Sequence, residues 1–246
     1  MLNSDRFCQS CGAPINEGAG AAQNAPAIAA PAIKFPLWLM TTAGGLAGAT
    51  IAQAIRLILL EIFPGAPWNW AMSLGSYPSY FYLSWYDLVI WGLFGALTCL
   101  GVALAVDYSL TGRINTAFIG LPLGLGAGVV GWIFFSFLNS GWVLNNAGSF
   151  RYYDWIMPAT FVIVGLLIGI GVGIVGKRVG VSCLGGLAGG VVAGLWFHFI
   201  AVPHISSFFV ALTAIPAVAI GAGIGVLLQL NQKNLDIRNE SPSRQD

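Results

Sequence analysis

The stretch Gly185 to Phe197, GGLAGGVVAGLWF, decides the fold of this chain. It is apolar throughout, and Gly186, Gly190 and Gly194 follow one another at four-residue spacing, so they lie on one face of a helix. In a lipid bilayer no hydrophobic force drives helices together, and glycines on one face let two backbones approach closely. The stretch therefore predicts a membrane-spanning helix with a glycine packing face. A substrate path along that face is the alternative, although few polar side chains lie near it.

Glycine patterns of the same kind occur elsewhere in the chain. The matching segments are Gly44–Gly48 with Gly185–Gly189, Gly128–Val130 with Gly190–Val192, and Gly101 with Gly171 and Gly223. Self-similarity on this scale indicates a repeated structural unit. We interpret the unit as a glycine-rich helical hairpin that is used three times.

The composition also indicates a membrane protein. Of the 246 residues, 57% are hydrophobic and 8% are charged, whereas about 25% of an ordinary soluble domain is charged. A helix needs about 20 apolar residues to cross the hydrocarbon core. Six runs are long enough, at about 37–62, 88–106, 117–138, 156–176, 179–202 and 207–230. Transmembrane barrels have shorter strands of alternating polarity, so we expect an all-α integral membrane domain of six transmembrane helices.

The placement of basic residues predicts the orientation in the membrane. Most lysines and arginines lie before the first span, in the second or fourth loop, or after the last span: Arg6, Lys34, Arg113, Lys177, Arg178, Lys233, Arg238 and Arg244. The opposite face has only Arg151 in a loop and Arg56 inside a span. Because Lys and Arg accumulate in cytoplasmic loops, we expect both termini in the cytoplasm of a cell whose plasma membrane holds the bundle. The partner is the lipid bilayer, and no nucleic acid is expected.

A short cysteine motif lies near the N-terminus. Residues 7–15, FCQSCGAPI, have the form Cys-x-x-Cys-Gly followed by a small residue and proline. This form resembles the first knuckle of a zinc ribbon, which implies that Cys8 and Cys11 are zinc ligands. A complete ribbon needs a second pair of ligands, and Cys99 and Cys183 fall within predicted spans. Three interpretations stay open: a degenerate knuckle without metal, a zinc site shared between two chains, and a dithiol redox site.

Composition divides the chain into four segments. Residues 1–16 contain the zinc-ribbon-like half-knuckle, and residues 17–34 are rich in Ala, Pro and Gly, which predicts a flexible linker. Residues 35–231 form the six-helix domain, and residues 232–246 form a polar tail. No secretory signal peptide is visible before the first span, so we expect that span to direct insertion.

Three charged residues form a candidate polar cluster. Arg56 is the only basic residue inside a predicted span, where a cation at mid-bilayer costs at least about 3 kcal/mol. Its side chain either snorkels to the headgroups or forms an ion pair with Asp87 or Asp154, which begin the second and fourth spans. These acids either cap helix N-termini or bind a cation at the outer mouth of the bundle.

Aromatic residues and prolines add further expectations. Residues 64–86 contain eight aromatic side chains, which predicts an interfacial segment on the outer leaflet or, as the alternative, a lid over a ligand cavity. Pro158 is expected near the start of its helix. Pro122 and Pro216 are expected deeper, where a proline loosens the hydrogen-bond ladder.

No catalytic motif is recognisable in the sequence, so we expect no enzymatic activity. The chain is similar to bacterial multi-pass membrane proteins that carry a zinc-ribbon-type segment before a glycine-rich bundle. That resemblance is compositional and implies no catalytic residues. We expect a scaffold or interaction protein that forms a homo-oligomer or binds another membrane protein. The alternative is a small transporter or channel that uses Arg56, Asp87 and Asp154.

Overall fold

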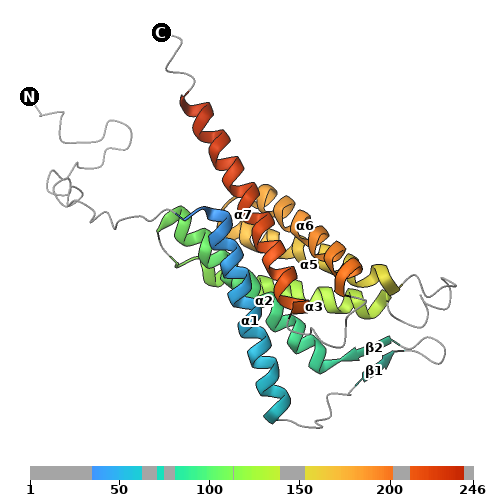
Figure 1. Ribbon diagram of the computed structural model, residues 1–246. Helices are drawn as coiled ribbons and strands as arrows, with labels where there is room; N and C mark the ends of the chain where they lie inside the picture. Colours follow the sequence, from blue (N-terminus) through green and yellow to red (C-terminus); the bar gives the residue numbers. More distant parts are fainter. Residues whose placement is uncertain are drawn as a thin grey trace, which may run out of the picture. The chain divides into compact units, whose positions relative to one another are not determined.

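The computed structural model describes residues 35–62, 71–74, 81–112, 114–138, 153–201 and 211–240. The chain divides into two units, Met1–Lys34 and Phe35–Asp246, and all described residues belong to the second. Its long helices are α1 (Leu37–Ile62), α2 (Trp85–Thr111), α3 (Gly120–Leu138), α5 (Tyr153–Val175), α6 (Val179–Trp196) and α7 (Ala211–Glu240) (Figure 1). A 3-10 turn, Ala117–Ile119, leads into α3, and a π-helical turn, Phe197–Ala201, continues α6.

The six helices confirm the predicted spans. Each contains a segment that is long and apolar enough to cross a membrane, and in lipid a helix satisfies all of its backbone hydrogen bonds internally. The chain is therefore a multi-pass helical membrane protein. Helix α7 runs on to Glu240, so residues 232–240 of the predicted polar tail continue the last helix and project beyond the bundle (Figure 1).

One element was not predicted. Strand β1 (Ala71–Leu74) pairs with β2 (Phe81–Ser84) in an antiparallel hairpin, with Ala71 opposite Ser84 and Leu74 opposite Phe81. The hairpin lies in the aromatic segment between α1 and α2, so the all-α prediction holds for the spans and not for this loop.

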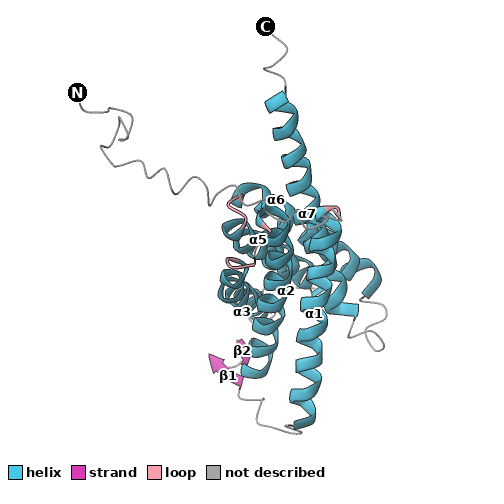
Figure 2. Cartoon of the chain, turned by 90° about the vertical axis from the view of Figure 1, so that its left-hand side faces the viewer, coloured by secondary structure: helices cyan, strands magenta, loops and turns pink. Residues whose placement is uncertain are grey.

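Three helices occupy the centre of the bundle and three surround them. Helices α2, α5 and α7 contact one another, and more than half of the membrane segment of α2 and of α5 is buried (56% and 61%). Helix α1 packs between α7 and α2, α3 between α2 and α5, and α6 between α5 and α7 (Figure 2). We call the end where α1 begins and α7 leaves the terminal end, and the opposite end the aromatic end.

Aliphatic side chains fill the space between the three central helices. These fully buried residues are Val102 and Val106 of α2, Val164, Ile168 and Val172 of α5, and Ile220, Ile224 and Leu228 of α7. The outer helices instead expose large apolar side chains such as Ile51, Ile133 and Val192, which is the arrangement expected of helices that face lipid.

Glycines bring neighbouring backbones into contact at most helix interfaces. A Cβ atom on Gly44 of α1 would collide with the Gly101 carbonyl of α2, and the reverse also holds. Reciprocal contacts of this kind join Gly95 of α2 with Gly124 of α3, Gly165 of α5 with Gly186 of α6, and Gly185 of α6 with Gly223 of α7. Helix α7 also meets α1 closely, because a Cβ on Gly221 would lie 2.5 Å from the Thr41 carbonyl oxygen.

The interface between α3 and α5 is different because side chains separate the two backbones. A Cβ on Gly171 of α5 would meet the Leu123 side chain at 3.2 Å, and a Cβ on Gly131 of α3 would meet the Val164 side chain. This pair is therefore packed by side chains, whereas α1–α2 and α6–α7 are packed backbone to backbone.

The prolines differ from expectation in two cases. Pro158 was expected near the start of its helix, but it is the sixth residue of α5 and lies past the first turn. Pro122 is the third residue of α3 and lies in its first turn, where the missing amide hydrogen costs no helical hydrogen bond. The prediction of a deep position for Pro122 is wrong because α3 begins only at Gly120. Pro216 does lie inside α7, which continues past it.

Candidate functional site

The structure separates the members of the predicted polar cluster. Arg56 lies in α1 and Asp87 in the first turn of α2, two helices that pack together. Asp154 is the second residue of α5, which packs chiefly against α2, α3 and α6, and its side chain lies outside the described residues. Cys8 and Cys11 also lie outside the described residues.

The register between α1 and α2 sets the depth of Arg56. Gly44 faces Gly101, and Gly48 faces the Leu97 carbonyl one turn away. If this antiparallel register continues, Arg56 comes to the level of Val89, about half a turn from Asp87. Arg56 and Asp87 are both half-buried. Among the predicted site residues that the structure describes, Arg56 and Asp87 therefore come to one level on adjacent helices.

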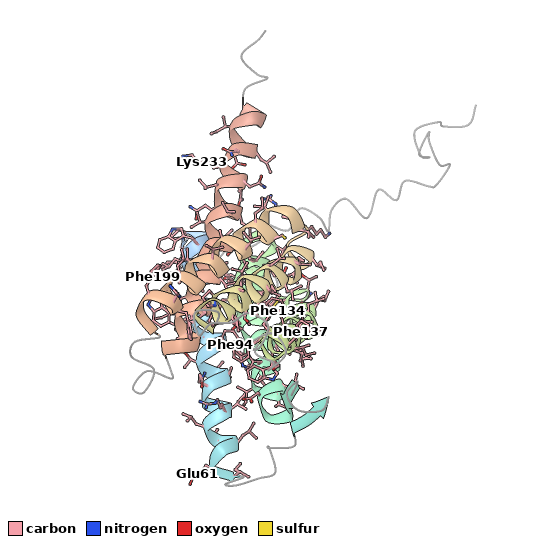
Figure 3. All side chains as sticks on the ribbon, turned by 90° about the vertical axis from the view of Figure 1, so that its right-hand side faces the viewer. Glu61, Phe94, Phe134, Phe137, Phe199 and Lys233 are labelled. Atoms are coloured by element: carbon pink, nitrogen blue, oxygen red, sulfur yellow. The ribbon has the colours of Figure 1, made fainter. Side chains whose placement is uncertain are left out.

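An aromatic cluster lies between α2, α3, α5 and the end of α6. Trp91 is at its centre, with ring centroids 6.0 Å from Phe94, 5.9 Å from Trp132 and 6.0 Å from Phe161. Trp132 also stacks on Phe135 at 5.0 Å, and Phe161 contacts Phe197 at 5.7 Å. Figure 3 shows Phe94, Phe134 and Phe137 on the body of the bundle, away from Glu61 at the end of α1 and Lys233 on the projecting part of α7.

Two buried polar atoms beside this cluster have no hydrogen-bond partner among the described residues. They are Nε1 of Trp132 and Oγ of Ser136. The residue Ser136 as a whole is 5% exposed. The two residues are four apart on α3 and so share one face of the helix. By contrast, the Thr160 hydroxyl donates to the Ile156 carbonyl one turn earlier, at 2.8 Å. This corner of the bundle therefore presents hydrogen-bond donors within an apolar, aromatic setting.

A buried acid missed by sequence reasoning lies at the terminal end. Asp107 of α2 is 3% exposed, and its Oδ2 accepts hydrogen bonds from the backbone amides of Thr116 at 2.9 Å and Ala117 at 3.1 Å. Its Oδ1 accepts one from the Thr111 hydroxyl at 3.1 Å. The carboxylate thus satisfies the free amides at the start of the turn that leads into α3. The signal in the sequence was an acid near the end of an apolar run, shortly before Gly112.

The other two outer helices begin differently at this end. The Gln229 side chain of α7 accepts a long hydrogen bond, 3.5 Å, from the Trp38 amide in the first turn of α1. Helix α6 has no side-chain cap, and the turn before it contains Lys177 with a φ of 53°. The amides of Lys177 and Arg178 bond back to Ile174 and Gly173, which is the Schellman motif that usually has glycine at the left-handed position.

No family model, curated protein or solved structure matches this chain. The resemblance to zinc ribbons and to bacterial membrane proteins is therefore unsupported by comparison. Within the described ranges, no three His, Cys, Asp or Glu side chains come together as metal ligands would. The class that the fold defines is a multi-pass helical membrane protein with six apolar helices.

Proposed function

We propose that this protein is a non-enzymatic integral membrane scaffold that forms a homo-oligomer or holds a partner membrane protein. The observation that carries the proposal is backbone contact on both sides of two outer helices, α1 and α6. Gly44 of α1 meets α2 while Gly45 meets the Ala217 carbonyl of α7, and Gly185 of α6 meets α7 while Gly186 meets α5. Packed groups of this kind have few alternative arrangements, so the bundle is suited to present fixed surfaces.

We further propose that the bundle consists of three glycine-rich hairpin repeats, α1–α2, α3–α5 and α6–α7. The proposal is supported by contacts that match in register. The pairs Gly44–Gly101 and Gly48–Leu97 of the first hairpin correspond to Gly185–Gly223 and Gly189–Ala219 of the third, and Leu123–Gly171 occupies the place of the first of these pairs in the second. Between hairpins, Gly124–Gly95 and Gly128–Trp91 correspond to Gly186–Gly165 and Gly190–Phe161.

The remaining parts of the proposal concern the terminal end. Basic residues lie in or beyond the helix ends there: Lys177, Arg178, Lys233 and Arg238. The positive-inside rule then gives cytoplasmic termini in the plasma membrane.

Cys8 and Cys11 would share a zinc ion with a second chain on the same side. Metal analysis of the purified protein tests this part, because zinc that copurifies equally with Cys8→Ser would exclude a shared site.

Crosslinking in intact membranes tests the scaffold. The protein is expressed at several levels, treated with a membrane-permeant amine-reactive crosslinker, and purified through a C-terminal tag. We expect a crosslinked homo-oligomer or one partner in constant ratio at every expression level. A chain that stays monomeric without any copurifying protein would refute the proposal.

A transporter or channel is the second candidate, and the common level of Arg56 and Asp87 favours it. Polar groups paired inside a bundle often mark an ion pathway. Purified protein in liposomes with an internal pH dye and a potential dye would report proton or cation flux. Flux that disappears in Arg56→Leu, Asp87→Asn and Asp154→Asn, while the variants still insert and elute as wild type, would favour transport. Equal flux in vesicles with wild type, with the variants and without protein would eliminate it.

A further inference from the structure

The three hairpins close into a ring, because the contact between the third and the first matches the contacts between the others. In each case a glycine of an outer helix meets the backbone carbonyl of a small residue in the preceding hairpin: Gly45 with Ala217, Gly124 with Gly95, and Gly186 with Gly165. A ring that closes in this way has no free end at which a further hairpin could add. A partner in the membrane therefore approaches from outside, where α1, α3 and α6 lie.

The outward face of α1 is lined by small side chains. Ala43, Ala47, Thr50 and Ala54 are all exposed, and their spacing of four, three and four residues places them on one side of the helix. The Thr50 hydroxyl donates to the Leu46 carbonyl of its own helix at 2.8 Å. Small residues at such spacing are what membrane helices use to approach one another closely.

The corresponding faces of the other two outer helices carry larger side chains. The same four places of the repeat are occupied by Pro122, Gly126, Val129 and Ile133 in α3, and by Leu184, Ala188, Val191 and Leu195 in α6. Of the three outer helices, only α1 has small residues at all four. The span of α1 is also the least apolar and the least buried of the six described spans. Lipid favours apolar side chains, so the most exposed span would be the most apolar if lipid alone covered it.

The place where the N-terminal segment joins the bundle favours a second copy of this chain as the partner. The 34 residues that precede Phe35, with Cys8 and Cys11 among them, are connected to the first turn of α1. Two copies that meet through α1 therefore bring their two segments to one place, as a zinc ion shared between two chains requires. A central helix separates α1 from α3 and from α6, so copies that meet through those helices would keep the connections further apart.

The charges of α1 are compatible with a symmetric pair. Both copies have the same orientation in the membrane, so a twofold axis along the membrane normal places the two α1 helices side by side with Ala47 opposite Ala47. Arg56 comes nine residues after Ala47 and therefore lies on the other side of the helix. Glu61 shares the small face, but it lies about 21 Å further along, where two helices that cross at about −40° have separated.

We propose that the outward face of α1 is a homodimer interface, in which Ala43, Ala47, Thr50 and Ala54 pack against the same residues of a second copy. The inference rests on the proposed scaffold function and names the surface through which the scaffold assembles. The larger side chains on the outward faces of α3 and α6 then remain in contact with lipid.

Disulfide crosslinking in intact membranes tests the contact. The full chain with Ala47→Cys is oxidised with copper phenanthroline and compared with wild type and with Ala188→Cys, which has the corresponding exposed place in α6. A disulfide requires two Cα atoms less than about 7 Å apart. We expect a reducible dimer in the Ala47→Cys variant well above the amount in both controls.

A larger side chain at the same position tests the affinity. Ala47→Leu adds bulk to an exposed face, so the bundle should fold while the dissociation constant of the dimer rises about tenfold. Ala188→Leu is the matched control and should dimerise as wild type does. Energy transfer between labelled copies in liposomes, at increasing ratios of lipid to protein, gives the dissociation constant. Thermal unfolding verifies that both variants are folded.

The outcomes distinguish this interface from the scaffold function on which it rests. A homo-oligomer that the amine-reactive crosslinker captures, but that neither Ala47 variant affects, would overturn the α1 interface and leave the scaffold in place. Loss of a different copurifying protein in Ala47→Leu, without a dimer in Ala47→Cys, would overturn the second copy as the occupant and assign the face to that protein. A wild-type chain that is monomeric and without a partner at every expression level would overturn both.

Discussion

The α1–α2 and α6–α7 pairs and the α3–α5 pair occupy corresponding places in the bundle but are packed by different means. In the first two pairs a glycine faces a glycine, Gly44 with Gly101 and Gly185 with Gly223, and the backbones touch. In the third pair Leu123 faces Gly171, so a side chain stands between the backbones. The difference shows that a leucine in the place of a facing glycine puts a side chain between two helix backbones.

The two kinds of pair can also be compared by the groups that lie beside them. Buried polar side chains occur on the helices of both kinds of pair, for example Thr41 and Thr98 on α1 and α2, and Ser136 and Thr160 on α3 and α5. Beside the α3–α5 pair, Trp132 of α3 and Phe161 of α5 both contact the ring of Trp91 of α2. The side-chain-packed pair is thus the one whose two helices both contribute rings to the aromatic cluster.

Substitution of a facing glycine by valine is expected to have the largest effect. In Gly223→Val the new side chain would collide with the Gly185 carbonyl, and because backbone cannot yield cheaply, we expect a loss of more than about 4 kcal/mol and failure to fold. Fluorescence-detected size exclusion after membrane extraction measures this. Gly126→Val is the control, since its Cβ has no neighbour within 4 Å. Equal elution profiles for the two variants would show that the α6–α7 backbones do not touch.

Removal of a ring from the side-chain-packed pair is expected to be the next largest effect. Phe161 is 2% exposed and contacts both Trp91 and Phe197, so Phe161→Ala leaves a cavity that costs about 3 kcal/mol. The thermal midpoint in detergent reports the loss. Phe118→Ala, at a ring that is 55% exposed, should change the midpoint little. A similar shift of the thermal midpoint in both variants would mean that the buried ring of Phe161 stabilises the protein no more than an exposed ring that contacts lipid.

A comparison of single methyl groups sharpens the contrast between the pairs. Gly101→Ala places a Cβ against the Gly44 carbonyl, and we expect a cost of about 2 kcal/mol. Gly171→Ala occupies the corresponding place in α5 but meets only the side chains of Cys99 at 3.0 Å and Leu123 at 3.2 Å. Because side chains can shift, its cost should stay below about 1 kcal/mol. Chemical unfolding of both variants in one detergent measures the two losses of stability. A larger loss for Gly171→Ala than for Gly101→Ala would contradict the packing distinction.

The turn that leads into the α3–α5 pair is expected to depend on Asp107. Asp107→Ala removes the acceptor for the Thr116 and Ala117 amides, which should cost about 1 to 2 kcal/mol. Asp107→Asn keeps one acceptor oxygen and should cost less. Amide hydrogen exchange across residues 114–120 should quicken in the alanine variant only. Unchanged exchange in that variant would mean that the carboxylate does not hold the turn.

Replacement of Lys177 by glycine, in the turn that leads from α5 to α6, is expected to stabilise the protein by a small amount. Lys177 has a left-handed backbone conformation, which costs a residue with a side chain about 1 kcal/mol and glycine almost nothing. Lys177→Gly should therefore raise stability by about 0.5 to 1 kcal/mol. Gly112→Ala is the reciprocal variant at the other turn, where φ is 68°, and it should lower stability by a similar amount. Shifts of the same sign in both would refute the strain argument.

Much of the fold could be read from the sequence because its cause is local. Apolar runs of sufficient length must be helices in lipid, and the six spans follow from this. Glycine spacing such as Gly186, Gly190 and Gly194 identifies a packing face from the helical period alone, and all three glycines meet α5 in the structure. The place of Pro122 was misjudged because a helix start depends on the preceding turn.

The candidate site could be predicted only in part. Arg56 and Asp87 stood out as charges in or beside apolar spans, and their common level follows from the packing of α1 on α2. Asp87 and Asp154 look equivalent in sequence, yet Asp87 lies one turn before Trp91 whereas Asp154 lies nearly two turns before Phe161, the residue that Trp91 contacts. Their levels therefore differ by about one turn.

The sequence by itself determined which segments are helices and which faces of them are suited to close packing. Only the tertiary structure decided which glycine meets which, that Leu123 separates α3 from α5, and that Trp91 gathers rings from three helices around it. The physical reason is the distance along the chain over which each effect acts. Hydrophobicity and helical period act within one segment, whereas the register of two helices and the satisfaction of a buried hydrogen-bonding group depend on atoms that lie far away in the chain.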